Sequence, residues 1–73
     1  MHLFMKHILP LAAMEKLLKA AGAERVSEDA KEALRDVLED HAAELGKRAN
    51  QFASHAKRKT VKGSDVQLAG RHH

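Results

Sequence analysis

The sequence predicts an all-α chain in which one long helix is flanked by two short ones. Three observations lead to this prediction. Apolar residues recur at steps of three and four across residues 27–57, which is the period of one helix face. The same spacing recurs after Pro10, and Gly22 and Ser27 supply stop and start signals between the two stretches. A third and shorter apolar stretch lies near the C-terminus.

The first short helix is expected to begin at Pro10, because the fixed φ of proline suits the first helical position and its missing N–H is not needed there. Four apolar residues at i, i+3, i+4 and i+7 then share one face. They are Met14, Leu17, Leu18 and Ala21. Gly22 is expected to end the helix as a left-handed cap.

Residues 27–57 are predicted to form one continuous helix, since no proline interrupts them. Ser27 is the cap, and Glu28 and Asp29 suit the positive end of the helix dipole. Roughly 29 helical residues span about 43 Å. A compact domain of 73 residues has a radius of gyration of only about 11 Å. The apolar face of the long helix therefore needs cover from outside the chain, and a second copy is the simplest source.

The remaining segments complete the organisation of the chain. Residues 60–62 contain β-branched side chains and are expected to form a brief strand, and the third helix is expected to run from Gly63 to Gly70. Residues 1–9 form an apolar extension, and the pattern leaves open whether it adds a turn to the core or forms an arm. The predicted divisions are thus an N-terminal extension at 1–9, one folded domain at 10–70 and a C-terminal tail at 71–73.

The composition narrows the possible functions. The chain has no cysteine, which excludes disulfides and thiolate zinc sites and fits a reducing cytoplasm. A chain of 73 residues rarely builds a sufficient core alone, so oligomerisation is the favoured remedy. Residues 1–9 are too short to span a membrane. No nucleophile–base constellation, glycine-rich phosphate loop or pair of catalytic carboxylates can be found, so the chain is not expected to be an enzyme or to use a cofactor.

Charge is distributed unevenly along the chain. Residues 1–45 carry six Lys or Arg and nine Asp or Glu, a net charge of −3, whereas residues 46–73 carry seven bases and one acid, a net charge of +6. Such asymmetry indicates a polyanionic partner. The only aromatic residues are Phe4 and Phe52, so stacking on unpaired bases has little support. Duplex DNA bound through its backbone is the favoured polyanion.

The six histidines do not form a recognisable metal motif. They are His2, His7, His41, His55, His72 and His73. No two of them lie four residues apart in one predicted helix with a carboxylate companion, which a helical zinc site requires. No metal site is therefore expected.

Two stretches resemble archaeal histones. Residues 21–30 (AGAERVSEDA) resemble the first loop of that family, and residues 55–66 (HAKRKTVKGSDV) resemble its second loop and the start of its third helix. The resemblance covers about residues 9–69. It implies a histone fold and a handshake homodimer, in which the first loop of one chain lies beside the second loop of the other.

The resemblance also implies a set of DNA-contacting residues. They are Lys16, Arg25, Ser27, Lys57, Lys59, Thr60 and Lys62. Arg25 would reach into the minor groove, Thr60 would hold the Arg25 of the second copy, and Lys59 would contact phosphate. Lys16 stands where many members have arginine, so it keeps the charge but loses the bidentate fork.

Three further roles follow from the same resemblance. Arg58 and Asp65 would form an intrachain salt bridge that braces the second loop. Phe52, His55 and Asp65 would form a dimer–dimer interface, with a hydrogen bond from His55 to Asp65 across it. Tetramers or longer assemblies on DNA would then be accessible.

The function expected from the sequence is that of an architectural protein. It would bind double-stranded DNA with little sequence preference and bend, wrap or compact it as a homodimer or higher assembly, in the cytoplasm and associated with the chromosome or nucleoid. It would act on no membrane and on no small-molecule substrate. The alternative is a histone-fold module whose main partner is another protein, with DNA binding incidental; the apolar residues 1–9 are its best support.

Overall fold

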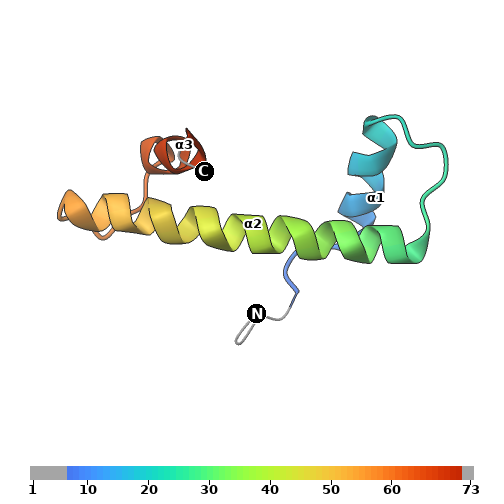
Figure 1. The fold of residues 1–73 in the computed structure, drawn as a ribbon, viewed down its shortest axis with the longest axis horizontal. Coiled ribbons are helices and arrows are strands. Elements are labelled where there is room, and N and C mark those ends of the chain that lie inside the picture. Colours follow the sequence, from blue (N-terminus) through green and yellow to red (C-terminus); the bar gives the residue numbers. More distant parts are fainter. Residues whose placement is uncertain (1–6, 72–73) are drawn as a thin grey trace. The chain divides into compact units, whose positions relative to one another are not determined.

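The computed structural model of the chain describes residues 7–71, which form three α-helices (Figure 1). Helix α1 spans Leu11–Ala20, α2 spans Glu28–His55 and α3 spans Gly63–Arg71. The predicted all-α class and the short–long–short order are confirmed. Two connections separate the helices, and we call residues 21–27 the first loop and residues 56–62 the second loop.

Residues 60–62 do not form the predicted strand, and residues 7–71 contain no strand at all. The backbone N–H of Lys62 instead donates a hydrogen bond to the Asp65 carboxylate at 2.8 Å, just before α3. The β-branched side chains of Thr60 and Val61 are exposed in the second loop. A β-branched pair favours extended backbone, but a strand also needs a neighbouring strand to accept its hydrogen bonds.

Helix α1 begins one residue later than predicted. Pro10 has φ −77° and ψ 144°, which is extended backbone, so Pro10 precedes the helix. Its carbonyl accepts hydrogen bonds from the N–H groups of Ala13 and Met14 at 3.2 and 3.4 Å. The φ of proline suits both positions, and the ψ value places Pro10 at the cap.

The end of α1 agrees with the prediction that Gly22 is a left-handed cap. Gly22 has φ 114°. Its N–H donates to the Lys19 carbonyl at 3.0 Å, and the N–H of Ala23 donates to the Leu18 carbonyl at 3.0 Å. These two bonds form a Schellman motif, which satisfies carbonyls that the end of a helix leaves without partners.

Helix α2 ends with the same motif, but a lysine occupies the left-handed position. Lys57 has φ 59°. Its N–H donates to the Ser54 carbonyl at 2.9 Å, and the N–H of Arg58 donates to the Ala53 carbonyl at 2.9 Å. The helix predicted to reach Lys57 therefore ends at His55, because the backbone reverses its twist at Lys57.

Helix α3 continues through Gly70, where the sequence predicted its end, to Arg71. Arg48 on α2 accounts for this difference, because its Nη2 donates a hydrogen bond to the Ala69 carbonyl at 3.3 Å. A carbonyl in the last turn of α3 thus has a partner without a left-handed glycine.

The described residues bury few apolar side chains. The chain divides into two compact units, one ending at Asp40 and the other beginning at His41, and α2 contributes residues to both. In the first unit Met14 is buried. In the second unit the buried apolar residues are Ala49, Ala53 and Ala69.

Several large apolar side chains are exposed instead. Val37 on α2 is 63% exposed and Leu17 on α1 is 52% exposed. Burying a side chain of this size contributes about 1.5–3 kcal/mol, so leaving both in water forgoes a large part of the available stabilisation. Within residues 7–71 no helix is long and apolar enough to cross a membrane.

Candidate nucleic-acid interface

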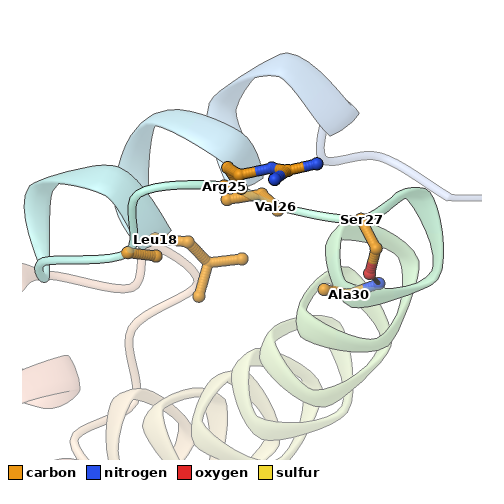
Figure 2. A pocket seen from close by; sticks show the side chains of 6 residues that line it. Leu18, Arg25, Val26, Ser27 and Ala30 are labelled. Atoms are coloured by element: carbon orange, nitrogen blue, oxygen red, sulfur yellow. Dashed lines mark hydrogen bonds between the residues drawn. The ribbon is translucent and has the colours of Figure 1, made fainter.

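Helix α1 and the first loop carry Lys16, Arg25 and Ser27 in the first unit. Figure 2 shows Arg25 and Val26 on the first loop, Ser27 at the start of α2 and Leu18 on α1, around an open pocket. The side chains of Lys16 and Arg25 are both exposed. Neither forms an ion pair with any residue from 7 to 71. Both cations are therefore available to an external anion.

Ser27 caps α2 as predicted. Its Oγ accepts a hydrogen bond from the N–H of Ala30 at 3.2 Å and donates one to Asp29 Oδ1 at 2.6 Å. The hydroxyl is thus engaged within the chain as both donor and acceptor. Contact between Ser27 and a phosphate would use the backbone at the helix N-terminus, where N–H groups and the helix dipole favour anions.

A charge network ties α1 to the first turns of α2. Lys31 Nζ lies 2.8 Å from Glu28 Oε2 and 3.4 Å from Glu15 Oε1, and Lys19 Nζ lies 3.1 Å from Glu15 Oε2. The hydrogen bond from Lys19, followed by the bond from Lys31, lowers the pKa of Glu15. The bond to Glu28 is the main cause of a raised pKa at Lys31. These two lysines are engaged with carboxylates, whereas Lys16 and Arg25 are not.

The second loop carries a run of cations in the second unit. Lys57, Lys59 and Lys62 are exposed, as is Thr60. No acidic residue interrupts residues 57–62, and none of the three lysines forms an ion pair with another described residue. Three solvated ammonium groups within six residues form a local positive patch that a polyphosphate backbone would satisfy.

Arg58 and Asp65 form the ion pair that the resemblance implies, and it fixes the shape of the second loop. Arg58 Nη1 donates to Asp65 Oδ2 and Nη2 donates to Asp65 Oδ1, each at 3.0 Å. Nη1 also donates to the Thr60 carbonyl at 2.9 Å. The guanidinium therefore joins the middle of the loop to the start of α3 through a bidentate contact.

Asp65 completes this brace from the side of α3. It is buried and accepts the N–H of Lys62, so it acts as the acid of a capping box at the helix N-terminus. The bonds from Arg58, followed by the Lys62 N–H, lower the pKa of Asp65 to about 2. The bond to Asp65 also raises the pKa of Arg58.

The residues expected at a dimer–dimer interface differ in exposure. Phe52 is half-buried and His55 is exposed at the last position of α2, while Asp65 is buried in its own chain. A carboxylate offers about four acceptor positions, of which the three internal bonds to Asp65 use three. One acceptor position therefore remains for a histidine of another dimer.

Sequence reasoning missed Glu39, the most buried charged residue described. Glu39 Oε2 accepts the backbone N–H groups of Ile8 and Leu9 at 2.6 and 2.8 Å, and Oε1 lies 2.9 Å from His7 Nδ1. The Leu9 N–H, followed by His7, lowers the pKa of Glu39 to about 2. Residues 7–9 are thus docked on α2, which settles their part of the open question about residues 1–9; residues 1–6 lie outside the described residues.

Comparisons with known proteins agree with this geometry. Residues 7–69 match the family described as histone-like transcription factor (CBF/NF-Y) and archaeal histone. The chain is 59% identical over 61 residues to the archaeal histone HAN1 of Thermococcus zilligii, covering 84% of this chain and 91% of the relative. The chain belongs to the archaeal histone family. This histone is also 48% identical over 61 residues to probable archaeal histone 3 of Methanocaldococcus jannaschii, with the same coverage.

Membership gives the three helices their meaning. This archaeal histone has a histone fold, and its function is that of an architectural DNA-binding protein. The matched region contains both loops and the Arg58–Asp65 brace. It also contains residues 7–9, which dock on Glu39.

Proposed function

We propose that this histone acts as a handshake homodimer that bends, wraps or compacts double-stranded DNA with little sequence preference. The observation that carries the proposal is the presence of two loops with exposed cations that no described carboxylate neutralises. In the cell we expect the dimer on the chromosome, in the cytoplasm. The folded domain is expected to comprise residues 10–70, between an extension at 1–9 and a tail at 71–73.

The exposed apolar surface supports the homodimer. Val37 and Leu17 are large apolar side chains left in water by a chain that buries few of its own. An open pocket in the first unit is lined by apolar side chains that include Leu18, Val26 and Ala30. The second loop offers Val61, which is 42% exposed. In a handshake dimer the Val61 of the second copy would cover this pocket.

Arg25 is proposed as the minor-groove residue. Its side chain is exposed, forms no ion pair within residues 7–71 and stands on a loop anchored by Gly22 at one end and the Ser27 cap at the other. A guanidinium placed in a narrowed minor groove senses groove width and deformability more than base identity. Thr60 of the second copy is proposed to hold Arg25 in place.

The lysines and Ser27 are proposed to position the dimer on the DNA backbone. Lys57, Lys59 and Lys62 would contact phosphates from the second loop, and Lys16 would do so from α1. The N-terminus of α2 at Ser27 would offer backbone N–H groups. Because phosphate contacts carry no sequence information, weak sequence preference follows from this arrangement.

Assembly beyond the dimer is proposed to use the end of α2 and the start of α3. Phe52 would supply apolar area, and His55 would donate a hydrogen bond to the acceptor position of Asp65 that its own chain leaves open. Light scattering on DNA-bound protein, compared between wild type and His55→Ala, measures this step. Complexes of unchanged size in the variant would remove His55 from the interface.

The test of DNA binding is a salt series with two duplexes of unrelated sequence, followed by fluorescence anisotropy. Six to ten phosphate contacts should reduce the affinity by about 10³–10⁵-fold between 50 and 200 mM salt, equally for both duplexes. Arg25→Ala should weaken binding, while Lys47→Ala, which removes one charge from an exposed position of α2, serves as the matched control. Negligible binding at low salt would overturn the proposal and favour a protein partner.

A further inference from the structure

The fold brings three metal-ligating side chains together at a place remote in sequence from both loops. His7 Nδ1 lies 2.9 Å from Glu39 Oε1 and 3.6 Å from Asp36 Oδ1. The donor atoms of the three residues all lie within 4.8 Å of one another. His7 stands before α1, and the two acids stand three residues apart on α2, so they face the same side of the helix.

We propose that His7, Asp36 and Glu39 bind a divalent zinc ion. This site goes beyond the architectural function and does not depend on it. Zinc takes imidazole nitrogen and carboxylate oxygen at about 2.0–2.2 Å in tetrahedral sites, which places neighbouring donors about 3.3 Å apart. The two separations from His7 Nδ1, 2.9 and 3.6 Å, lie on either side of that value. Small side-chain rotations therefore complete the geometry.

Glu39 is oriented for this task by the backbone. The N–H groups of Ile8 and Leu9 hold Oε2 at 2.6 and 2.8 Å, which leaves Oε1 directed at His7. Partners of this kind fix the direction of a ligand and strengthen metal binding. Glu39 itself is only 4% exposed, so its position is set by the packing around it.

The other two ligands leave the site open to solvent. The side chains of His7 and Asp36 are 47% and 54% exposed, so an ion has a path from water and Asp36 is free to rotate. Three protein ligands leave the fourth tetrahedral position to a water molecule. The imidazole favours zinc over magnesium or calcium, which prefer oxygen ligands alone. A bound ion would join residues 7–9 to α2 more firmly than the hydrogen bonds do.

No local sequence pattern marks this site, because His7 is separated from Asp36 and Glu39 by 29 and 32 positions. A search for histidine pairs within one helix passes over a single histidine that docks on a helix from outside. The two acids look like ordinary solvent-facing residues of an amphipathic helix.

Calorimetric titration of the full chain with zinc chloride tests the proposal. We expect one zinc ion per chain and a first equivalent that shifts the imidazole NMR signals of His7. Asp36→Asn should weaken binding by about tenfold or more, since loss of even an outer-shell partner costs 10–100-fold. Asparagine has the same shape and Asp36 is half exposed, so the variant is expected to fold.

Glu32→Gln is the matched control, because it removes one carboxylate from an exposed position of the same helix. It should bind zinc as the wild type does. The thermal midpoint of unfolding should rise with zinc in the wild type and in Glu32→Gln, and to a smaller extent in Asp36→Asn. Unchanged affinity in Asp36→Asn, or a first equivalent that shifts His72 and His73 while His7 stays constant, would overturn the proposal.

Discussion

Lys57 allows a sharp test of how α2 ends. Its φ of 59° places a side chain with a Cβ in the left-handed region, whereas the equivalent position after α1 is Gly22. The left-handed conformation costs a residue with a Cβ roughly 1–2 kcal/mol. Glycine gives back about 0.4–1 kcal/mol through the greater freedom of the unfolded chain. The difference predicts that Lys57→Gly stabilises each chain by about 0.5–1 kcal/mol relative to Lys57→Ala.

The comparison with alanine isolates the backbone effect. Both variants remove the same positive charge from the second loop, so both should lose the same DNA affinity at low salt. Urea and thermal unfolding, followed by circular dichroism at one fixed protein concentration, measure the stability difference. For a domain of this size, 1 kcal/mol corresponds to about 4–8 °C in the thermal midpoint. If Lys57→Gly proves no more stable than Lys57→Ala, the strain assigned to Lys57 is wrong.

Two further predictions concern acid stability and the homodimer. The pKa of Asp65 is about 2 in the folded chain, below its ordinary 3.8, so its stabilising effect is full above about pH 4 and is lost as the pH falls through 2. Asp65→Asn should therefore flatten the pH dependence of unfolding between pH 4 and 2; an unaltered profile would contradict the brace. Val37→Ala should destabilise the assembled protein by about 1–2 kcal/mol and weaken self-association in analytical ultracentrifugation, because a second copy covers Val37. An effect within 0.5 kcal/mol would show that Val37 stays in water.

Much of the fold could be predicted because local signals agree with one another. Ser27 and Gly22 mark helix boundaries through hydrogen bonds that involve residues close in sequence, and such bonds depend little on the rest of the chain. The errors lie where a more distant residue intervenes. The end of α3 moved past Gly70 because Arg48 reaches a carbonyl from another helix, and residues 60–62 had no strand to pair with.

The candidate interface was predicted less evenly. The positions of Arg25 and the second-loop lysines came from resemblance, and the structure adds that these side chains have no internal carboxylate to neutralise them. The engagement of the Ser27 hydroxyl within its own cap could not be predicted from residue identity, since serine caps also occur with a free O–H. Glu39 was missed because its partners are backbone N–H groups about 30 residues away, which no side-chain pattern reveals.

The brace between Arg58 and Asp65 has a thermodynamic consequence for recognition. A loop already held by two guanidinium bonds and a backbone bond loses little conformational freedom when DNA arrives, because its ordering was completed during folding. The second loop then contributes no coupled folding to the binding reaction, and its share of the heat-capacity change should be small. Recognition by this loop is a rigid docking event, in which the duplex is the partner that deforms.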